Sequence, residues 1–336
     1  MAPADIIAAL PDAAIIVGAD GIVMAANASA TDALQLEPKG LQAAALIRQP
    51  NFVVALTETK VSRQPVVIDV ELQGRPPRQF SAHLAPIAKG LDVLVVLRDL
   101  TREQRIERMR SDFVANASHE MRTPLAAIIG TVETLQGAAK NDAKAREKFF
   151  DSMLTQARRM KRLIDDLLTL SRIELNEHVR PNAKVDLQDM IRQATSNLAG
   201  MAKESRVVFS TDASVTTLVA GDADELLQVT QNLLENAIKY GGSGGQVEII
   251  CQPEGRLGML RVRDFGKGIA EMHLPRLTER FYRVSTQESR ARGGTGLGLA
   301  IVKHIVSRHR GRLEISSTPG HGSIFTVTIP LYISAP

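Results

Sequence analysis

Hydrophobic positions in the first hundred residues come in short runs separated by glycine, proline and polar turns. Runs such as AAIIVG, GIVMAA and QPVVIDVEL are rich in β-branched residues, and brief segments with helical spacing lie between them. This mixture predicts a compact α+β module over residues 1–100. Its last strand, within LDVLVVLRDL, leads directly into a helical pattern.

The hydrophobic period is helical over residues 101–136 and again over 144–176, with the loop-like GAAKNDA between them. The second helix carries an apolar seam with alternating spacings of four and three residues, formed by Met153, Ala157, Met160, Ile164 and Leu167. Two helices alone make a small core, so we expect residues 101–180 to form a hairpin that dimerises into a four-helix bundle. A monomeric hairpin packed on its neighbours is the alternative.

After Pro181, helical segments alternate with strand-like runs to the end of the chain. The helical patterns LQDMIRQATSNLAGMAK and ADELLQVTQNLLENAIKY are followed by strands such as GQVEIICQ, GMLRVRDFG and SIFTVTIPL. This order predicts an α/β sandwich domain over residues 181–336. The whole chain is therefore predicted to be a multidomain α+β protein.

Composition excludes several classes of protein. The chain has no apolar run of about 18 residues and no basic leader, so we expect no membrane span and a cytoplasmic location. A membrane-attached segment upstream of Met1 would leave this sequence unchanged. The single cysteine, Cys251, excludes a disulfide framework. The net charge is only +4 and the basic runs are interleaved with acidic or apolar residues, which favours solvated helix faces over nucleic-acid binding.

Candidate chemistry appears in the helical stretch DELLQVTQNLLENAIKYGG. At about 100° per residue the leucines fall on one side, and the other side presents Asn232, Asn236, Lys239 and Tyr240. Asparagine prefers caps and turns, so two of them in mid-helix indicate a function. Carboxamide oxygens can ligate Mg²⁺, and lysine can bind phosphate. Taken alone, the pattern also fits a solvated polar face.

Two glycine-containing stretches add to this picture. RVRDFGKGIAEM places Asp264 at a strand end before Gly266 and Gly268, where bare backbone lets a planar ligand approach a carboxylate. Further on, a helix is predicted to begin near Leu297, in a stretch that contains Gly293, Gly294, Gly296 and Gly298. Free backbone N–H groups at such a helix start are suited to bind an anion. The polar STQESRARGG beside it can close over a phosphate chain. The spacing matches neither a Rossmann nor a Walker motif.

Five motifs in this order, SHEMRTPL, NLLENAIKY, DFGKGI, RFYRV and GGTGLGLAIV, closely resemble the bacterial two-component sensor histidine kinases. The resemblance covers residues 101–333. It implies a dimerisation and phosphotransfer hairpin, followed by a GHKL-type ATP-binding sandwich like that of gyrase and mismatch-repair ATPases. Residues 1–100 are similar, less specifically, to a PAS sensor module. The order of these modules is similar to that in the sensor kinases of the phosphate regulon.

The resemblance also implies roles at the nucleotide site, with ATP and Mg²⁺ as cofactors. Asn236 matches the Mg²⁺ ligand, and Asn232 supports it from one turn earlier. Tyr240 is expected to stack on adenine, and Asp264 to accept a hydrogen bond from the adenine amino group.

The remaining positions of that site follow the same resemblance. Lys239 and Arg283 are expected to contact phosphates, and Gly266 and Gly268 to border the base. The lid hinge and its phosphate contacts are expected to consist of Gly294, Thr295, Gly296, Leu297, Gly298 and Leu299.

His119 lies in FVANASHEMRTPLAAIIG, on the first helix of the hairpin. A neutral imidazole is a nucleophile near pH 7, and by the resemblance His119 is the phosphoacceptor. Glu120 is expected to orient the ring and to accept its proton. Pro124 cannot donate to the carbonyl of Glu120, so we expect the helix to bend there. The phosphoryl group would then pass to an aspartate of a response regulator docked on the hairpin.

Thr123 lies one turn after His119, on the same helix face. In the family this position is associated with dephosphorylating the partner regulator, so we expect that second activity here. Two alternatives remain at this point. One is a GHKL-type ATPase without phosphotransfer, although such enzymes carry a general-base glutamate where this chain has Asn232. The other is a catalytically idle scaffold, which the intact His119 and Asn236 argue against.

Overall fold

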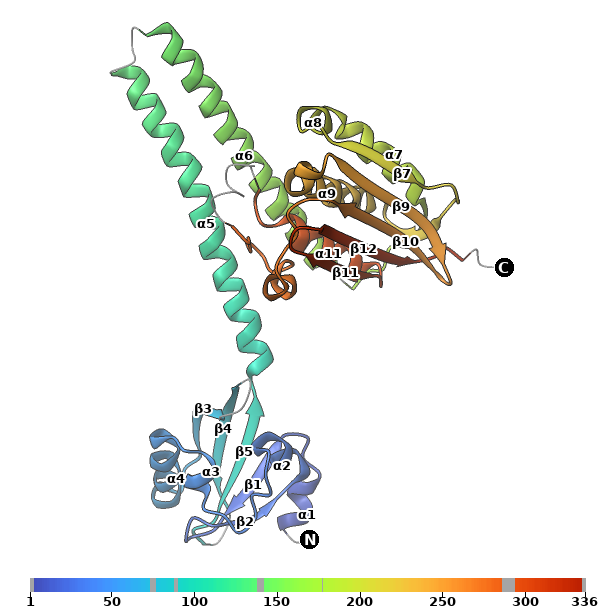
Figure 1. Cartoon of the computed structure of the whole chain (residues 1–336). Coiled ribbons are helices and arrows are strands. Elements are labelled where there is room, and N and C mark those ends of the chain that lie inside the picture. The colour runs from blue at the N-terminus through green and yellow to red at the C-terminus, as the bar shows by residue number, and fades with distance from the viewer. Residues whose placement is uncertain are drawn as a thin grey trace. The chain divides into compact units, whose positions relative to one another are not determined.

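The computed structural model of this chain describes residues 3–72, 77–87, 90–137, 142–176, 178–285 and 294–333. The chain forms two compact units, Met1–Ala115 and Asn116–Pro336 (Figure 1). Among the described residues, none of the helices has both the length and the hydropathy that crossing a membrane requires.

The first unit is built on an antiparallel five-stranded sheet with strand order β2-β1-β5-β4-β3. Its strands are β1 (Ala13–Val17), β2 (Val23–Ala26), β3 (Val66–Leu72), β4 (Arg78–Pro86) and β5 (Val93–Asp99). Its helices are α1 (Pro3–Ala8), α2 (Ala28–Leu34), α3 (Ala43–Leu46) and α4 (Pro50–Ser62). The α+β character expected of this region is confirmed.

Both faces of β1, which lies between β2 and β5, are buried, which explains its uninterrupted apolar sequence. Ile15 joins the main core beneath α2, α3 and α4, where Phe52 is fully buried. On the opposite face, Ile16 packs with Ile7 of α1. The side chain of Asn27 holds α1 in place because its amide donates to the carbonyls of residues 7, 10 and 12.

The helical hairpin consists of α5 (Thr101–Gln136) and α6 (Ala143–Leu175). Helix α5 continues through Pro124, so the proline does not end the helix. Helix α6 begins at a capped turn, where the Asp142 carboxylate accepts a hydrogen bond from the backbone N–H of Ala145 at 2.9 Å. Both helices therefore form where the hydrophobic period predicts them.

Much of the apolar surface of the hairpin remains exposed in a single chain. Leu163, Leu170 and Ile173 are buried, whereas Ile164 and Leu168 are 42% and 61% exposed. Further exposed apolar side chains on the two helices are Val114, Leu125, Ile129, Val132, Phe150, Leu154 and Leu175. A hairpin with so much apolar surface requires a partner to cover it.

The remainder of the second unit is a sandwich of a mixed sheet and helices. Its main sheet has the order β11-β12-β10-β9-β7, in which only β7 and β9 are parallel among the described strands. Its strands are β7 (Val208–Asp212), β9 (Gln246–Glu254), β10 (Leu257–Asp264), β11 (Arg312–Thr318) and β12 (Gly322–Pro330). A second, two-stranded sheet pairs β6 (Ala183–Asp186) with β8 (Leu218–Gly221).

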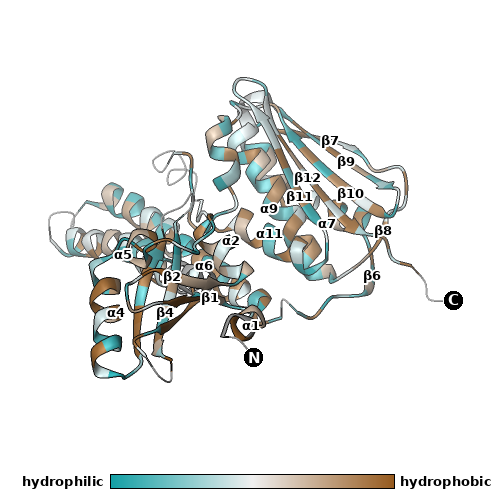
Figure 2. Cartoon of the chain, turned by 90° about the horizontal axis from the view of Figure 1, so that it is seen from below, coloured by the Kyte–Doolittle hydropathy of each residue, from teal (hydrophilic) through white to brown (hydrophobic). Residues whose placement is uncertain are grey.

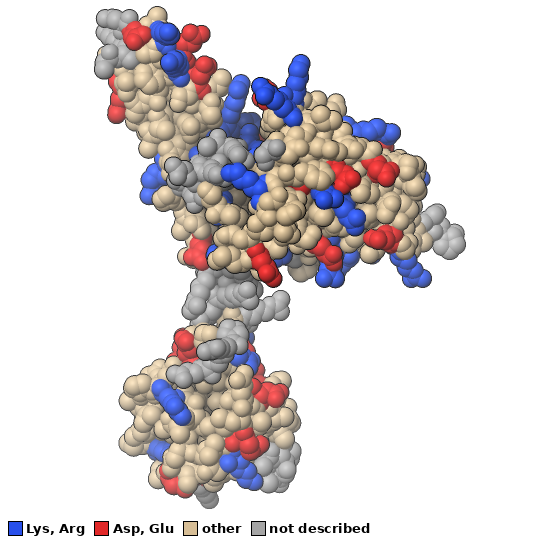
Figure 3. Space-filling model, viewed as in Figure 1, with Lys and Arg blue, Asp and Glu red and all other residues tan. Residues whose placement is uncertain are grey.

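Helices α9 (Ala223–Gly241) and α11 (Gly298–Arg308) pack against this main sheet, and α7 (Leu187–Asn197) packs beside α9 (Figure 1). The short segments α8 (Ala199–Glu204), η1 (Gly242–Gly244) and η2 (Glu271–Arg276) complete this part. Apolar and polar residues alternate along β9 and β10 (Figure 2), as a half-buried sheet requires. Lys, Arg, Asp and Glu are interspersed on the face shown in Figure 3.

Candidate functional site

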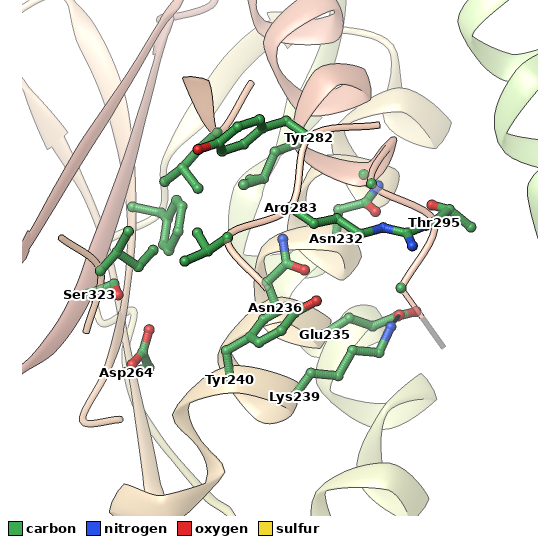
Figure 4. A pocket seen from close by; sticks show the side chains of 18 of the residues that line it. Asn232, Glu235, Asn236, Lys239, Tyr240, Asp264, Tyr282, Arg283, Thr295 and Ser323 are labelled. Atoms are coloured by element: carbon green, nitrogen blue, oxygen red, sulfur yellow. Dashed lines mark hydrogen bonds and ion pairs between the residues drawn. The ribbon is translucent and has the colours of Figure 1, made fainter. Parts of the chain in front are cut away.

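Helix α9 presents the polar face that the sequence predicts. The Asp222 carboxylate caps its N-terminus by accepting from the backbone N–H of Glu225 at 3.1 Å. Its buried side includes Leu226, Leu233 and Leu234, whereas its polar side lines a cavity of about 360 Å³ (Figure 4). A cavity of this size accommodates a small-molecule ligand.

The two asparagines of α9 are held differently. The Asn232 amide nitrogen donates to the carbonyl of Gln228 at 3.0 Å, which leaves its oxygen for the cavity. A Cβ at position 298 would lie 2.7 Å from that oxygen, so Gly298 leaves room for the Asn232 amide where α11 begins. None of the described residues hydrogen-bonds the Asn236 amide, which lines the cavity one turn later. Its carbonyl oxygen is suited to ligate a hard cation such as Mg²⁺.

Lys239 and Tyr240 lie at the C-terminal end of the same face (Figure 4). The Lys239 ammonium pairs with the carboxylate of Glu235 at 2.6 Å, and its side chain is only 13% exposed. Tyr240 is 40% exposed and borders the cavity with its ring. The face thus combines a cation and an aromatic ring, as expected.

Asp264 ends β10 on the other side of the cavity, next to Ser323 of β12 (Figure 4). It is 4% exposed, and this burial raises the pKa of its carboxyl group. Hydrogen bonds from the backbone N–H of Gly266 and from Ser323 act in the opposite direction. Gly241 makes room for this carboxyl group, because a Cβ there would lie 2.3 Å from the Asp264 Cβ.

Glycines shape the loops around the cavity for distinct reasons. Gly268 lines the cavity with a φ of +66°, and a Cβ there would lie 2.1 Å from the Thr318 carbonyl oxygen. Gly296 has a φ of +76°, which only glycine adopts without strain. Its carbonyl accepts from the backbone N–H of Phe281 at 2.8 Å, joining the loop before α11 to the RFYRV segment.

Arg283 joins this cavity to the hairpin. Its Nη2 donates to Oε2 of Glu120 on α5 at 3.0 Å, and Arg159 of α6 donates to the same oxygen at 2.9 Å. The Arg283 side chain is 5% exposed, and its Nε and Nη1 have no hydrogen-bond partner among the described residues. Buried N–H groups of this kind at a cavity wall are suited to an anion.

The phosphoacceptor candidate His119 is exposed on α5, one residue before Glu120. Thr123 is also exposed, and its hydroxyl donates to the His119 carbonyl at 3.2 Å. Neither residue lines the cavity, but the Arg283–Glu120 contact connects this part of α5 to it.

Most of the predicted site residues share the cavity wall. Those on it are Asn232, Asn236, Lys239, Tyr240, Asp264, Gly268, Arg283, Gly294, Thr295, Gly296, Gly298 and Leu299. Gly266 is not on it, since it packs where a Cβ would lie 2.5 Å from the Tyr240 carbonyl oxygen. Leu297 is fully buried before α11. Gly293 and most of STQESRARGG lie outside the described residues.

Other residues that line this cavity were given no role by the sequence, and five of them show why. Glu235 and Tyr282 lie inside the motifs NLLENAIKY and RFYRV, and Ser323 begins the predicted strand SIFTVTIPL, so these stretches could have suggested them. Arg162 and Asp166 come from α6, where their spacing of four resembles any solvated helix face. Only the packing of α6 against this domain reveals them.

Comparison with known proteins identifies the families of the helical hairpin and of the sandwich domain. Residues 109–176 match the histidine kinase A phospho-acceptor domain, and residues 221–333 match the histidine kinase-, DNA gyrase B- and HSP90-like ATPases. The phosphate regulon sensor protein PhoR of Pseudomonas aeruginosa is 38% identical over 95% of this chain and 72% of its own length. The chain belongs to the two-component sensor histidine kinases. It is thus an ATP-dependent protein-histidine kinase, which confirms the interpretation of the five motifs.

Other sensor histidine kinases are similar over the hairpin and the ATP-binding domain. The sensor-like histidine kinase SenX3 of Mycolicibacterium smegmatis is 38% identical over 71% of this chain and 62% of its own length. The solved structure of the histidine kinase AdeS of Acinetobacter baumannii is similar with a TM-score of 0.52 and 28% identity, covering 64% of this chain and 98% of that one. Because the hairpin itself matches a phospho-acceptor family, an ATPase without phosphotransfer is not favoured.

Proposed function

We propose that this kinase transfers the γ-phosphoryl group of ATP to His119 and then to an aspartate of a response regulator. The observation that carries this assignment is the Arg283–Glu120 contact. It links the nucleotide cavity to the residue that follows His119, through an arginine that lines the cavity and whose Nε and Nη1 have no hydrogen-bond partner among the described residues. A phosphate bound by those groups would lie beside the phosphoacceptor helix.

In this reaction a ring nitrogen of His119 attacks the γ-phosphorus, the bond from the γ-phosphorus to the β,γ-bridging oxygen breaks, and ADP leaves. Phosphoryl transfer has a loose transition state, so charge neutralisation and positioning carry most of the catalysis. Lys239, Arg283 and the backbone N–H groups at the start of α11 would neutralise the phosphates, and the position of these residues on the cavity wall supports this. Glu120, fixed by two arginines, would orient the imidazole.

Mg²⁺ fits the residues on the cavity wall. Among the described residues, no three His, Cys, Asp or Glu side chains gather to hold a metal ion. Mg²⁺ in nucleotide enzymes keeps several waters and binds through phosphates with one or two protein oxygens. The Asn236 amide oxygen, supported by Asn232, supplies that kind of ligand. The ion would neutralise the phosphate charge.

The assembly proposed is a homodimer through the hairpin. The exposed apolar residues of α5 and α6, Ile164 and Leu168 among them, support this because a second hairpin would cover them. The same hairpin would receive the response regulator near His119. Thr123, exposed one turn further on, would orient water when the regulator is dephosphorylated.

The proposed pathway is the phosphate starvation response, with residues 1–100 as a PAS-like sensor module. The similarity to PhoR extends over 95% of this chain and therefore into that module, which supports a shared input. The five-stranded sheet with helices packed on it supports the PAS-like assignment.

Incubation with γ-³²P-labelled ATP tests the proposed transfer. Wild type should retain label that is stable in base and labile in acid, whereas His119→Gln should bind Mg-ATP but retain none. Label of that stability on His119→Gln would overturn the assignment. Adding a purified candidate regulator to the labelled wild type then tests the second transfer, which should move the label to an aspartate.

A further inference from the structure

The nucleotide cavity is completed by a helix of the hairpin. Besides residues of the ATP-binding domain, Arg162 and Asp166 of α6 line it, one helical turn apart. The cation Arg162 and the acid Asp166, both from the phosphotransfer hairpin, therefore border a cavity that is proposed to bind the phosphates of ATP. The acid is the unexpected member, because it repels phosphate.

The Asp166 carboxylate occupies a specific position in this wall. Its Oδ2 accepts a hydrogen bond from the hydroxyl of Thr295 at 2.8 Å, and Thr295 is only 8% exposed. Thr295 stands between Gly294 and Gly296, two residues before the N-cap of α11. Burial raises the pKa of the Asp166 carboxyl group, with Glu235 acting in the same direction. A carboxylate thus accepts from a hydroxyl that lies close to the helix start where a phosphate chain would bind.

Contacts further along α6 hold this carboxylate in the cavity. Arg280 pairs with Glu174 in the last turn of α6. The Arg308 Nε donates to the carbonyl oxygens of Asn176 at 3.1 Å and of Val179 at 3.0 Å, just beyond the helix. These contacts hold the C-terminal end of α6 against the ATP-binding domain. Asp166 can therefore leave the cavity only if α6 or the Asp166 side chain moves.

We propose that Asp166 sets the nucleotide affinity of this kinase by competing with the phosphate chain of ATP for the hydroxyl of Thr295, close to the start of α11. Nucleotide binding and close packing of α6 on α11 and Thr295 then oppose each other, so a shift of α6 relative to the ATP-binding domain changes affinity for ATP. This inference rests on the proposed function, in which this cavity binds Mg-ATP with its phosphates near α11.

The variant Asp166→Asn tests the proposal, because it removes the charge and keeps the shape and an oxygen that accepts from Thr295. Isothermal titration of the full chain should show affinity for Mg-ATP increased by about fivefold, the size expected for one unit charge in a partly screened site. Affinity for Mg-ADP should rise less, and affinity for adenosine should not change. Asp165→Asn, an exposed neighbour paired with Lys161, is the matched control and should leave all three affinities unchanged.

Unchanged or weaker affinity of Asp166→Asn for Mg-ATP would overturn the proposal. A loss of affinity that appears only when Mg²⁺ is present would instead make Asp166 a metal ligand. An equal gain in affinity for adenosine would mean that the substitution changed the shape of the cavity. That result would also overturn the proposal. Asp166→Ala, checked by thermal melting, serves as the second variant and should move in the same direction as Asp166→Asn. Failure of the proposed function is distinct, since wild type would then not bind Mg-ATP.

Discussion

The contact between Arg283 and Glu120 offers a test of how the nucleotide site acts on the phosphoacceptor helix. In Glu120→Gln the carboxylate charge disappears, while the side chain keeps its length. Arg283 then loses its charged partner although its side chain is only 5% exposed. We expect this guanidinium to shift toward the phosphates. The ATP-binding domain should then lose its fixed position on α5.

The size of the effect follows from burial. Removing one partner of a fully buried ion pair costs about 3–5 kcal/mol. Here Glu120 is 14% exposed, Arg159 also binds it, and bound phosphates give Arg283 another partner. We therefore expect a loss of about 1.5–3 kcal/mol in the transition state, or roughly a 10- to 100-fold lower rate of His119 phosphorylation. The apparent KM for ATP should change little, because Glu120 does not line the cavity.

A double-mutant cycle with Arg283→Met measures the pair directly. Autophosphorylation rates of wild type, both single variants and the double variant should give a coupling energy of at least about 1 kcal/mol. Lys161→Met with Asp165→Asn, an exposed pair on α6, is the control and should show almost none. If the Glu120 and Arg283 variants act additively, within about 0.4 kcal/mol, the contact does not position the reaction.

Four further outcomes are expected. Asn236→Ala should lose Mg²⁺-dependent nucleotide binding, and an unchanged calorimetric affinity for Mg-ATP would exclude the metal role. Thr123→Ala should keep autophosphorylation within a few-fold but slow regulator dephosphorylation about tenfold, which is roughly 1.4 kcal/mol of transition-state stabilisation. Equal decay of the phosphorylated regulator with wild type and Thr123→Ala would reject this role. Leu168→Glu should convert the dimer to monomer in light scattering, because a charge would replace an apolar side chain that is 61% exposed in one chain; a dimer that persists would contradict the hairpin interface. Burial lowers the pKa of His309, whose Nε2 accepts from the backbone N–H of Asp222 at 3.0 Å, so the unfolded chain binds a proton that the folded one does not. The free energy of unfolding should therefore fall as the pH drops below about 6.5, and His309→Gln should flatten that part of the pH profile; identical profiles would refute the assignment.

The sequence alone determined the features that depend on neighbours along the chain. Hydrophobic periods located α5 and α6, and the order of strands and helices predicted the sandwich, because burial of one face imposes those periods. The polar side of α9 was also predictable, since Asn232, Asn236 and Lys239 are one turn apart on one helix. Asp264 and the glycines near it were identified because few residue types allow the backbone that such loops need.

Only the tertiary structure decided which distant side chains meet. Arg283 and Glu120 are 163 residues apart, and no local pattern relates an arginine after a short aromatic motif to an acid beside a histidine. Likewise, Asp166 reaches Thr295 because α6 packs against α11, whereas along the chain it is one acid among several on a charged helix face. Only the packing also shows that Gly266 makes room for the end of α9. Such contacts depend on how whole elements pack, and that packing is set by the summed burial of many side chains rather than by any short stretch of sequence.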